Sequence, residues 1–124
     1  MSIPTDRKYL KSHEWHKADG DVVTIGITQI AADELTDITY VALPKVGTKL
    51  TAGGRFGEIE SVKATSDMYT GVTGEVVAVN DALNSNPGTV NTDPYEAGWM
   101  IKVKATEAGE NLLDAAAYAA ESGH

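Results

Sequence analysis

The stretch that decides the fold is FGEIESVKATSDMYTGVTGEVVAVN, residues 56–80. Two runs in it, Phe56–Lys63 and the residues from Met68 onward, are rich in residues that favour β-strands, and residues 64–67 between them are small and mostly polar. This pattern predicts a hairpin with its tip at residues 64–67. It also places one lysine, Lys63, beside that tip, where a backbone held on both sides presents a side chain to another protein.

The rest of the chain shows the same pattern of short strands separated by Gly, Asn, Asp and Pro. Gln29–Leu35 lacks the alternation of a strand, favours a helix and follows Thr28, a residue type that caps helices. The alanine-rich tail predicts a C-terminal helix at about 110–121, capped by Asn111 and ended by Gly123. The remaining predicted elements are strands at Tyr9–His16, Val22–Thr28, Ile38–Leu43, Lys49–Leu50, Glu75–Val79 and Trp99–Val103, and a surface loop with one helical turn at 80–98.

Length and composition limit the class of protein. The chain has 124 residues, of which 42% are hydrophobic, enough for one modest core without metal or disulfide support. We therefore expect a single domain over residues 1–124, with its core at about 8–104. Ten Lys and Arg against eighteen Asp and Glu give a formal net charge of −8. Such a surface repels phosphate backbones and anionic headgroups, so nucleic acid and membranes are not expected as partners, and basic proteins are favoured.

Cysteine is absent from the sequence, and so are long apolar segments. Without cysteine the chain itself has no disulfide, thiolate metal site or cysteine nucleophile, and any redox chemistry must be carried by an added group. No apolar run approaches the roughly 20 residues that span a bilayer, and residues 1–11 lack the apolar core of a signal peptide. We expect a cytoplasmic protein, most simply bacterial, and a processed mitochondrial form stays open.

Two further groups of residues contain the residue types of a metal site or an active site. His13 and His16 are three residues apart, and on a continuous strand this spacing puts them on opposite faces, so no metal site is expected. Ser12, His13 and Glu14 contain the residue types of a hydrolase triad, but adjacent residues rarely converge in space and no nucleophile elbow accompanies them. We therefore expect no catalytic residue and no stand-alone enzyme.

The order and spacing of several motifs resemble the H proteins of the glycine cleavage system, a family of lipoyl carrier proteins. The core ESVKA, followed by SD and then TGEVV, is specific for this family in that order, whereas VKA alone is too short to indicate any family. The resemblance covers nearly the whole chain, through KYLKSHEW (8–15), GIT (26–28), YVALPKVG (40–47), FGEIESVKATSDMY (56–69), TGEVVAVN (73–80), NTDPYEAGWMIKV (91–103) and LLDAAAY (112–118).

The resemblance implies a fold and an attachment site. The fold is all-β dominated, a lipoyl- or biotinyl-type barrel-sandwich hybrid of two small sheets with short helices and a C-terminal helix. Lys63 matches the lysine that carries lipoate in amide linkage, and Glu60 and Ala64 match positions that help the attaching enzyme recognise the site. Biotin carriers place Met on both sides of their lysine, where this chain has Val62 and Ala64. Lipoate is therefore the implied cofactor.

The resemblance also implies a function. The chain would shuttle an aminomethyl group from a pyridoxal-phosphate glycine decarboxylase to a tetrahydrofolate-dependent aminomethyltransferase. It would then pass electrons to dihydrolipoyl dehydrogenase, a flavoprotein that reduces NAD. A lipoate ligase or a lipoyl or octanoyl transferase would load it. An alternative with the same lysine hairpin is an H-like protein that relays lipoyl or octanoyl groups to other lipoyl proteins.

A cleft that shields the carrier arm from water is expected beside SHEW and the lysine hairpin. By the resemblance, Ser12, Glu14 and Asp67 hold the amine of the aminomethyl group, and carboxylates are suitable acceptors for a protonated amine. Two positions depart from the family pattern. Glu34, also expected at the cleft, stands where a histidine is frequent, so no imidazole acts there and a carboxylate could accept from the amine instead. Gly71 stands where proline is frequent, which predicts a more permissive return of the hairpin.

Overall fold

The computed structural model describes residues 3–107 and 112–121, in which short strands dominate. The larger sheet has the order β1-β2-β3-β9-β8-β5, made of Lys8–Tyr9, Glu14–Asp19, Val22–Ile27, Ile101–Glu107, Thr73–Val79 and Lys49–Leu50. The smaller sheet has the order β4-β6-β7, made of Ile38–Ala42, Arg55–Ser61 and Thr65–Tyr69. The helices are α1 Gln29–Leu35, α2 Ala82–Ser85, α3 Thr89–Thr92 and α4 Ala115–Glu121. The predicted fold class is confirmed.

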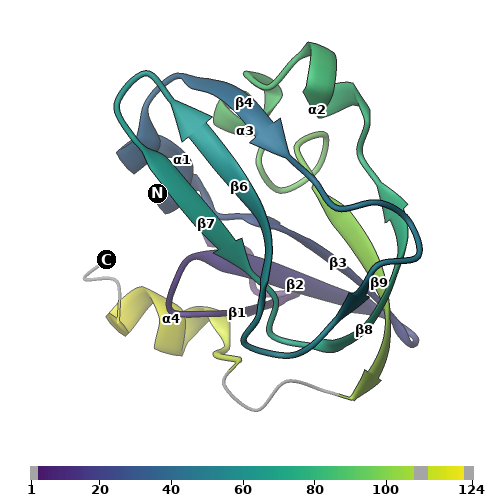
Figure 1. Cartoon of the computed structure of the whole chain (residues 1–124). Coiled ribbons are helices and arrows are strands. Elements are labelled where there is room, and N and C mark those ends of the chain that lie inside the picture. Colours follow the sequence, from purple (N-terminus) through teal and green to yellow (C-terminus); the bar gives the residue numbers. More distant parts are fainter. Residues whose placement is uncertain (1–2, 108–111, 122–124) are drawn as a thin grey trace.

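The two sheets pack against each other around one hydrophobic core, with the β4-β6-β7 sheet in front in Figure 1. In β6, Ile59 is buried between Glu58 and Glu60, which remain partly exposed, and Phe56 is also buried because the strand register shifts between Arg55 and Gly57. Alternate side chains of a strand point to opposite faces, so one face of this sheet is apolar and the other is polar. The core draws on both sheets and the segments that join them, including Ile25, Ile27, Val41, Ile59, Met68, Val76, Leu83, Ile101 and Val103.

The predicted strand Tyr9–His16 is wrong, because the chain reverses within it. β1 ends at Tyr9, β2 begins at Glu14, and the two strands pair antiparallel. His13 has a φ of 81°, a left-handed conformation that does not continue a strand. Its N–H donates to the carbonyl of Leu10 at 3.0 Å and closes the turn. His13 and His16 therefore do not lie on one continuous strand, contrary to the prediction, and no cluster of three metal-ligating side chains occurs among the described residues.

The lysine hairpin is confirmed, but its tip is earlier than predicted. β6 ends at Ser61 and β7 begins at Thr65, so the tip is residues 62–64 and contains Lys63 itself. Asp67 therefore lies within a strand, opposite Glu58. β7 does not continue directly into β8, because the chain crosses from the smaller sheet to the larger one between them.

The region before the last strand contains more helix than predicted. α2 and α3 both lie in residues 80–98, where one helical turn was expected. Figure 1 shows them together at the top of the molecule, beside β4. The last strand runs over Ile101–Glu107 rather than Trp99–Val103, and Met100, just before it, donates its N–H to the carbonyl of Ile25 on β3.

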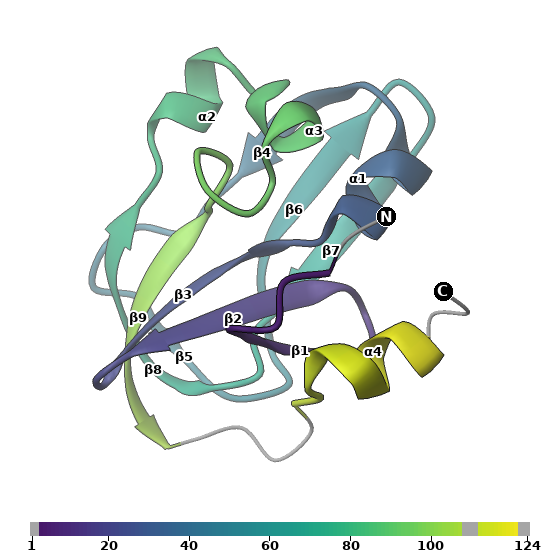
Figure 2. The same ribbon diagram turned by 180° about the vertical axis from the view of Figure 1, so that it is seen from behind.

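The C-terminal helix is shorter than predicted. Leu113 is extended, and its N–H and carbonyl both bond to the backbone of Tyr9, at 2.6 and 2.7 Å. Asp114 precedes α4, and its Oδ1 accepts from the N–H three residues later at 2.8 Å, which is how a capping carboxylate starts a helix. The predicted cap Asn111 and stop Gly123 lie outside the described residues. Figure 2 shows α4 lying alongside β1.

Candidate functional site

Lys63 lies at the hairpin tip, where the Ser61 side chain fixes the backbone. Ser61 Oγ accepts from the N–H groups of Lys63 and Ala64, at 3.1 and 3.0 Å, and donates to the carbonyl of Ala64 at 3.1 Å. Serine favours such turns because its hydroxyl satisfies nearby backbone groups. Val62, Lys63 and Ala64 are all exposed. The tip therefore has an ordered backbone and side chains that project into solvent.

The amine of Lys63 contacts the end of α1. Its Nζ donates to the backbone carbonyl of Glu34 at 3.2 Å. Beside this contact, the N–H of Val62 donates to the carbonyl of Asp37 at 3.0 Å. The carboxyl end of a helix carries partial negative charge, which favours a nearby ammonium. Glu34 thus lies next to Lys63, but through its main chain, so this contact does not depend on which side chain occupies position 34.

The two residues predicted to assist recognition lie near the tip in different settings. Ala64 is in the tip itself. Glu60 is on β6, opposite Tyr40 of β4 and Thr65 of β7, and its side chain is partly exposed. Both are within reach of a protein that binds around Lys63. Their assigned role stays a prediction.

Glu14 is a buried carboxyl group held by two donors. It is 1% exposed, and it accepts from Ser12 Oγ at 2.5 Å and from the N–H of Tyr69 at 2.9 Å. Burial raises the pKa of Glu14 to about 7, against the opposing effect of the two hydrogen bonds, which favour the charged form. The structure thus brings Ser12 and Glu14 together and joins them to the end of β7.

A cavity of about 530 Å³ is lined by Ser12 and Tyr69, the two residues that donate to Glu14, although Glu14 itself does not line it. Its other walls are Leu10, Lys11, Gly53, Leu112 and Leu113. Tyr69 is six residues from Lys63 along the hairpin, which is about 20 Å at ~3.4 Å per residue of strand. The cavity therefore lies at the far end of the strand that begins at the lysine tip, where a long flexible arm on Lys63 could approach it.

Asp67 is not part of the Ser12–Glu14 group. It lies on the outer face of β7, where Arg55 Nε donates to its Oδ1 at 2.8 Å. The same guanidinium reaches Glu58 at 2.8 Å. The predicted cleft residues therefore occupy three places: Ser12 with Glu14 at the cavity, Glu34 beside Lys63, and Asp67 on the outer sheet face.

Gly71 is a tightly packed position rather than a permissive one. It is buried, and a Cβ there would lie 2.7 Å from Cδ2 of Leu112. Its N–H donates to Nε2 of His16 at 2.9 Å. Because Nε2 accepts this bond, the proton of a neutral ring lies on Nδ1. Burial lowers the pKa of His16 to about 4, so the imidazole is neutral near pH 7.

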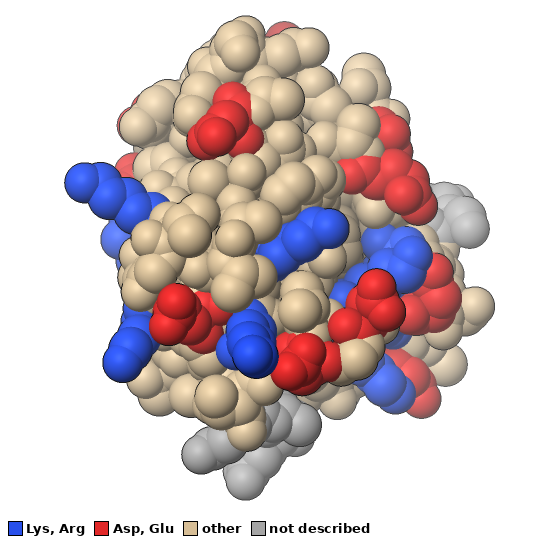
Figure 3. Space-filling view, turned by 90° about the vertical axis from the view of Figure 1, so that its right-hand side faces the viewer, with Lys and Arg blue, Asp and Glu red and all other residues tan. Residues whose placement is uncertain are grey.

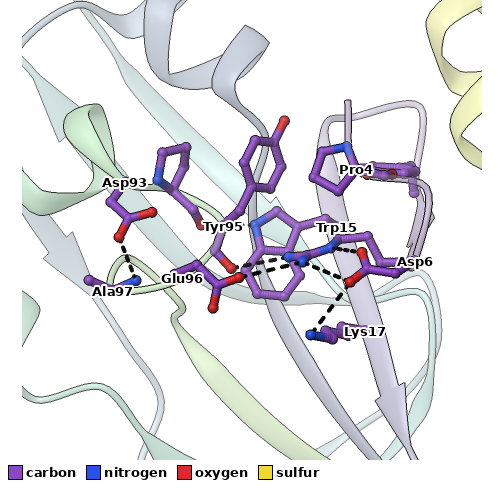
Figure 4. Close-up of polar contacts among 11 residues, drawn as sticks. Pro4, Asp6, Trp15, Lys17, Asp93, Tyr95, Glu96 and Ala97 are labelled. Atoms are coloured by element: carbon purple, nitrogen blue, oxygen red, sulfur yellow. Dashed lines mark hydrogen bonds and ion pairs between the residues drawn. The ribbon is translucent and has the colours of Figure 1, made fainter. Parts of the chain in front are cut away.

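The motif SHEW is tied to the loop that precedes the last strand (Figure 4). Trp15 Nε1 donates to the carbonyl of Pro94 at 3.0 Å. Arg7 lies over the Trp15 ring, 4.7 Å from its centroid, and donates to the carbonyl of Tyr95 at 3.1 Å. Asp6 pairs with this guanidinium at 2.8 Å, and the hydrogen bond lowers the pKa of Asp6. These contacts fix the loop that supports the strand carrying Glu14.

Several residues of the site were not foreseen from the sequence. Ser61 had a signal, because serine followed by a short polar segment favours a turn held by its hydroxyl. No comparable sequence signal exists for Tyr69, because it contributes only a backbone N–H. Tyr118 bonds to His13 Nδ1 at 2.6 Å and to Thr28 Oγ1 at 2.7 Å, which anchors α4 beside Ser12. These two contacts join residues about 90 or more positions apart, so no local sequence pattern predicts them.

A sandwich of two small β-sheets that presents an exposed lysine on a hairpin tip defines the class of lipoyl- and biotinyl-type carrier proteins. The model of the family Glycine cleavage H-protein matches residues 7–123. The chain belongs to this family. Its members carry lipoate in the glycine cleavage system and are carriers rather than enzymes.

Individual relatives agree with this assignment. The chain is 57% identical to the glycine cleavage system H protein of Beutenbergia cavernae, over 97% of this chain and 96% of the relative. It is 54% identical to the mitochondrial glycine cleavage system H protein of Oryza sativa subsp. indica, over 90% and 69%. The crystal structure of the H protein from Mycobacterium marinum superposes with a TM-score of 0.92 at 44% identity, covering 98% of this chain and all of that one. No described helix is long and apolar enough to cross a membrane.

Proposed function

We propose that this chain carries lipoate in amide linkage on Nζ of Lys63 and serves the glycine cleavage system through that arm. The observation that carries the proposal is the hairpin tip. Ser61 holds the backbone there, while the Lys63 side chain is exposed and its amine contacts only a backbone carbonyl among the described residues. An acyl group can therefore be placed on Nζ without disturbing the core.

Attachment balances as an acyl transfer. A lipoate ligase or a lipoyl or octanoyl transferase supplies the acyl group from an activated donor. An amide bond forms to Nζ, the bond to the donor's leaving group breaks, and the amine loses a proton. Recognition by Glu60 and Ala64 is part of the proposal. It is supported by their places beside and within the tip.

The bound lipoyl group supplies a disulfide–dithiol couple to a chain without cysteine. The proposed partners are glycine decarboxylase with pyridoxal phosphate, aminomethyltransferase with tetrahydrofolate, and dihydrolipoyl dehydrogenase with FAD and NAD. The chain contributes position, because a tethered arm meets successive active sites at raised effective concentration. We propose a bacterial cytoplasmic setting for this cycle.

The cavity beside Ser12 and Glu14 is the proposed shelter for the loaded arm. Leu10, Leu112 and Leu113 supply an apolar wall that would shield bound cargo from water, and the Glu14 carboxyl, bonded to Ser12 of the wall, can accept from an amine once it is ionised. Asp67 is a less direct candidate, because its carboxylate is bound to Arg55 on the outer face. Glu34 is proposed only as a neighbour of Lys63 in the unmodified chain.

Mass spectrometry tests the attachment site. The protein is incubated with lipoate, ATP and a lipoate ligase, and peptide mapping follows intact-mass measurement. We expect one lipoyl adduct, on Lys63, and none on the Lys63→Arg variant, which keeps the charge but is not a substrate. A Lys49→Arg variant, altered at an exposed lysine of β5, should be modified like the wild type. An adduct on another lysine would remove the basis of the proposal.

Exchange of the carboxyl group of glycine then distinguishes a function in glycine cleavage from the relay of lipoyl groups to other proteins. Fully lipoylated protein is mixed with glycine decarboxylase, glycine and labelled bicarbonate. Label should enter the carboxyl group of glycine only when lipoylated protein is present. A lack of exchange despite complete lipoylation would favour the relay function.

A further inference from the structure

Four large hydrophobic side chains are notably exposed among the described residues; one of them lies in the tip of the lysine hairpin and another on the strand beside it. Val62, 70% exposed, is next to Lys63, and Tyr40, 51% exposed, is on the adjacent strand β4. The other two, Val46 and Val77, are in the β4–β5 loop and on β8 of the larger sheet. Single exposed apolar residues are ordinary on a protein surface, so position rather than exposure must decide whether one matters.

Tyr40 occupies the outer face of the β4-β6-β7 sheet. It pairs with Glu60 of β6, which pairs in turn with Thr65 of β7. Residues directly opposite each other in an antiparallel sheet share a face, so these three side chains form one row. The row lies immediately before the tip that carries Lys63, and the sheet faces the viewer in Figure 1.

The next row carries further acidic groups in a fixed arrangement. It contains Glu58 opposite Asp67, and Arg55 binds both carboxylates at 2.8 Å. Glu60, in contrast, has no hydrogen-bond or ion-pair partner for its carboxylate among the residues that the structure describes. The face therefore presents an unpaired carboxylate and an exposed aromatic ring, side by side, on a regular sheet.

These features favour a protein partner of a defined kind. Tyrosine is enriched in the central contacts of interfaces, because a large ring is buried there at little cost in conformational entropy. A carboxylate beside it is matched by Lys or Arg on the partner. An enzyme that acylates Lys63 must place its reactive centre at Nζ and so must cover the surface around the tip.

We propose that the outer face of the β4-β6-β7 sheet, centred on Tyr40 and Glu60, is the docking surface of the enzyme that attaches the lipoyl group to Lys63. That enzyme meets it with an apolar pocket for the Tyr40 ring and a basic group for Glu60. The inference rests on the proposed function and adds a recognition residue, Tyr40, on a strand separate from the lysine hairpin.

A surface elsewhere on the molecule supplies the control. β8 lies on the right-hand side of Figure 1, and Figure 3 shows that side with Lys, Arg, Asp and Glu intermixed and no broad area of one sign. Val77 of β8 is 41% exposed, close to the exposure of Tyr40, but belongs to the larger sheet. Val77→Ser therefore removes a comparable apolar group without touching the proposed surface.

Steady-state kinetics of lipoylation test the inference. Unmodified full-length protein is varied as the substrate of a lipoate ligase with ATP and lipoate, comparing wild type, Tyr40→Ser, Tyr40→Phe and Val77→Ser. We expect KM for Tyr40→Ser to rise about tenfold with kcat unchanged, as for the loss of an interface anchor. The KM of Tyr40→Phe, which keeps the ring, should stay within about threefold of the wild-type KM. The KM of Val77→Ser should equal that of the wild type. Circular dichroism and thermal melting establish that each variant is folded.

Charge gives an independent readout on the same surface. Glu60→Gln should raise KM and make KM less dependent on salt, because one screened ion pair is lost. Equal KM values for Tyr40→Ser and Val77→Ser, or a fall in kcat without a change in KM, would overturn the docking surface while Lys63 is still modified. A wild-type protein that is not modified on Lys63 would instead remove the proposed function itself.

Discussion

Glu14 is the residue whose state most affects the candidate cleft. It is buried, lies next to the cavity and has a pKa of about 7, so both of its protonation states are populated near neutral pH. The protonated form is compatible with an apolar cavity, and the ionised form can accept from an ammonium. Two donors, from Ser12 and Tyr69, keep its oxygens in place in either state.

Glu14→Gln should change how stability depends on pH. Because the folded-state pKa is raised from 4.5 to about 7, the folded protein binds a proton more tightly than the unfolded chain. This stabilisation is full below the unfolded pKa and is lost as pH rises through about 7. Between about pH 5.5 and pH 8, the free energy of unfolding of the wild type should therefore fall by about 2 kcal/mol relative to that of Glu14→Gln. Urea denaturation at the two pH values measures it, and parallel pH profiles would contradict the raised pKa.

Gly71→Ala should destabilise the protein although it adds only one methyl group. The new Cβ would lie 2.7 Å from Leu112 and 3.2 Å from Nε2 of His16, so the packing must shift. We expect a loss of about 1–3 kcal/mol, as for other overpacked sites. Gly88→Ala is the control, because its Cβ meets only Asn86 Oδ1, at 3.9 Å. Thermal or urea unfolding of both variants gives the comparison, and equal effects would show that position 71 has room.

At the scale of elements, the sequence predicted most strands but misplaced where the chain turns. Hydrophobic alternation located the arms of the lysine hairpin and the strand Val22–Thr28, since buried faces repeat every second residue. It could not reveal the reversal before Glu14, which depends on the left-handed conformation of His13. Nor could it show that Leu113 pairs with Tyr9, because that contact forms only when the chain ends meet in the fold.

α4 is attached to the sheet by a polar contact at the end of a stacked pair of rings. Tyr118 stacks on Tyr9 at 4.7 Å, and its hydroxyl bonds to His13 and Thr28. Tyr118→Phe keeps the stacking but removes a hydrogen-bond partner from His13 and from Thr28. This should lower the free energy of unfolding by about 1–3 kcal/mol. Hydrogen exchange of the Leu113 N–H should become faster as α4 loosens. The reference is Tyr40→Phe, which removes a hydroxyl from an exposed ring; similar losses in both would contradict an anchoring role.

For the whole molecule, ordered motifs pointed to Lys63 as the proposed attachment lysine, while packing determined how the other site residues are grouped. Lys63 was accessible to sequence reasoning because its neighbours form a specific series. Ser12 and Glu14 were also predicted, but the burial of Glu14 depends on the docking of the smaller sheet, through the Tyr69 N–H. Asp67 was expected in the same group, yet the alternation of β7 places it on the outer face with Arg55.

Modification of Lys63 should be visible in the charge of the whole molecule. Amide formation removes one ammonium, which changes the formal net charge from −8 to −9. Because Lys63 is exposed, this change should appear in full on the surface, and the lipoylated protein should elute later from an anion-exchange column at about pH 8. Lys63→Gln should show the same charge effect without the lipoyl group. Co-elution of modified and unmodified wild type would mean that the lysine charge was already neutralised.

The hydrogen bond from the Tyr69 N–H to Glu14 gives the molecule an internal spectroscopic probe. It connects the end of the lysine hairpin to the one carboxyl group whose pKa is raised to about 7 among the described residues. The amide proton of Tyr69 should therefore shift in an NMR spectrum as Glu14 ionises, with no label beyond uniform ¹⁵N. The same resonance would report when cargo on the proposed arm reaches the cavity, so occupancy of the proposed shelter could be followed in solution from a single backbone signal.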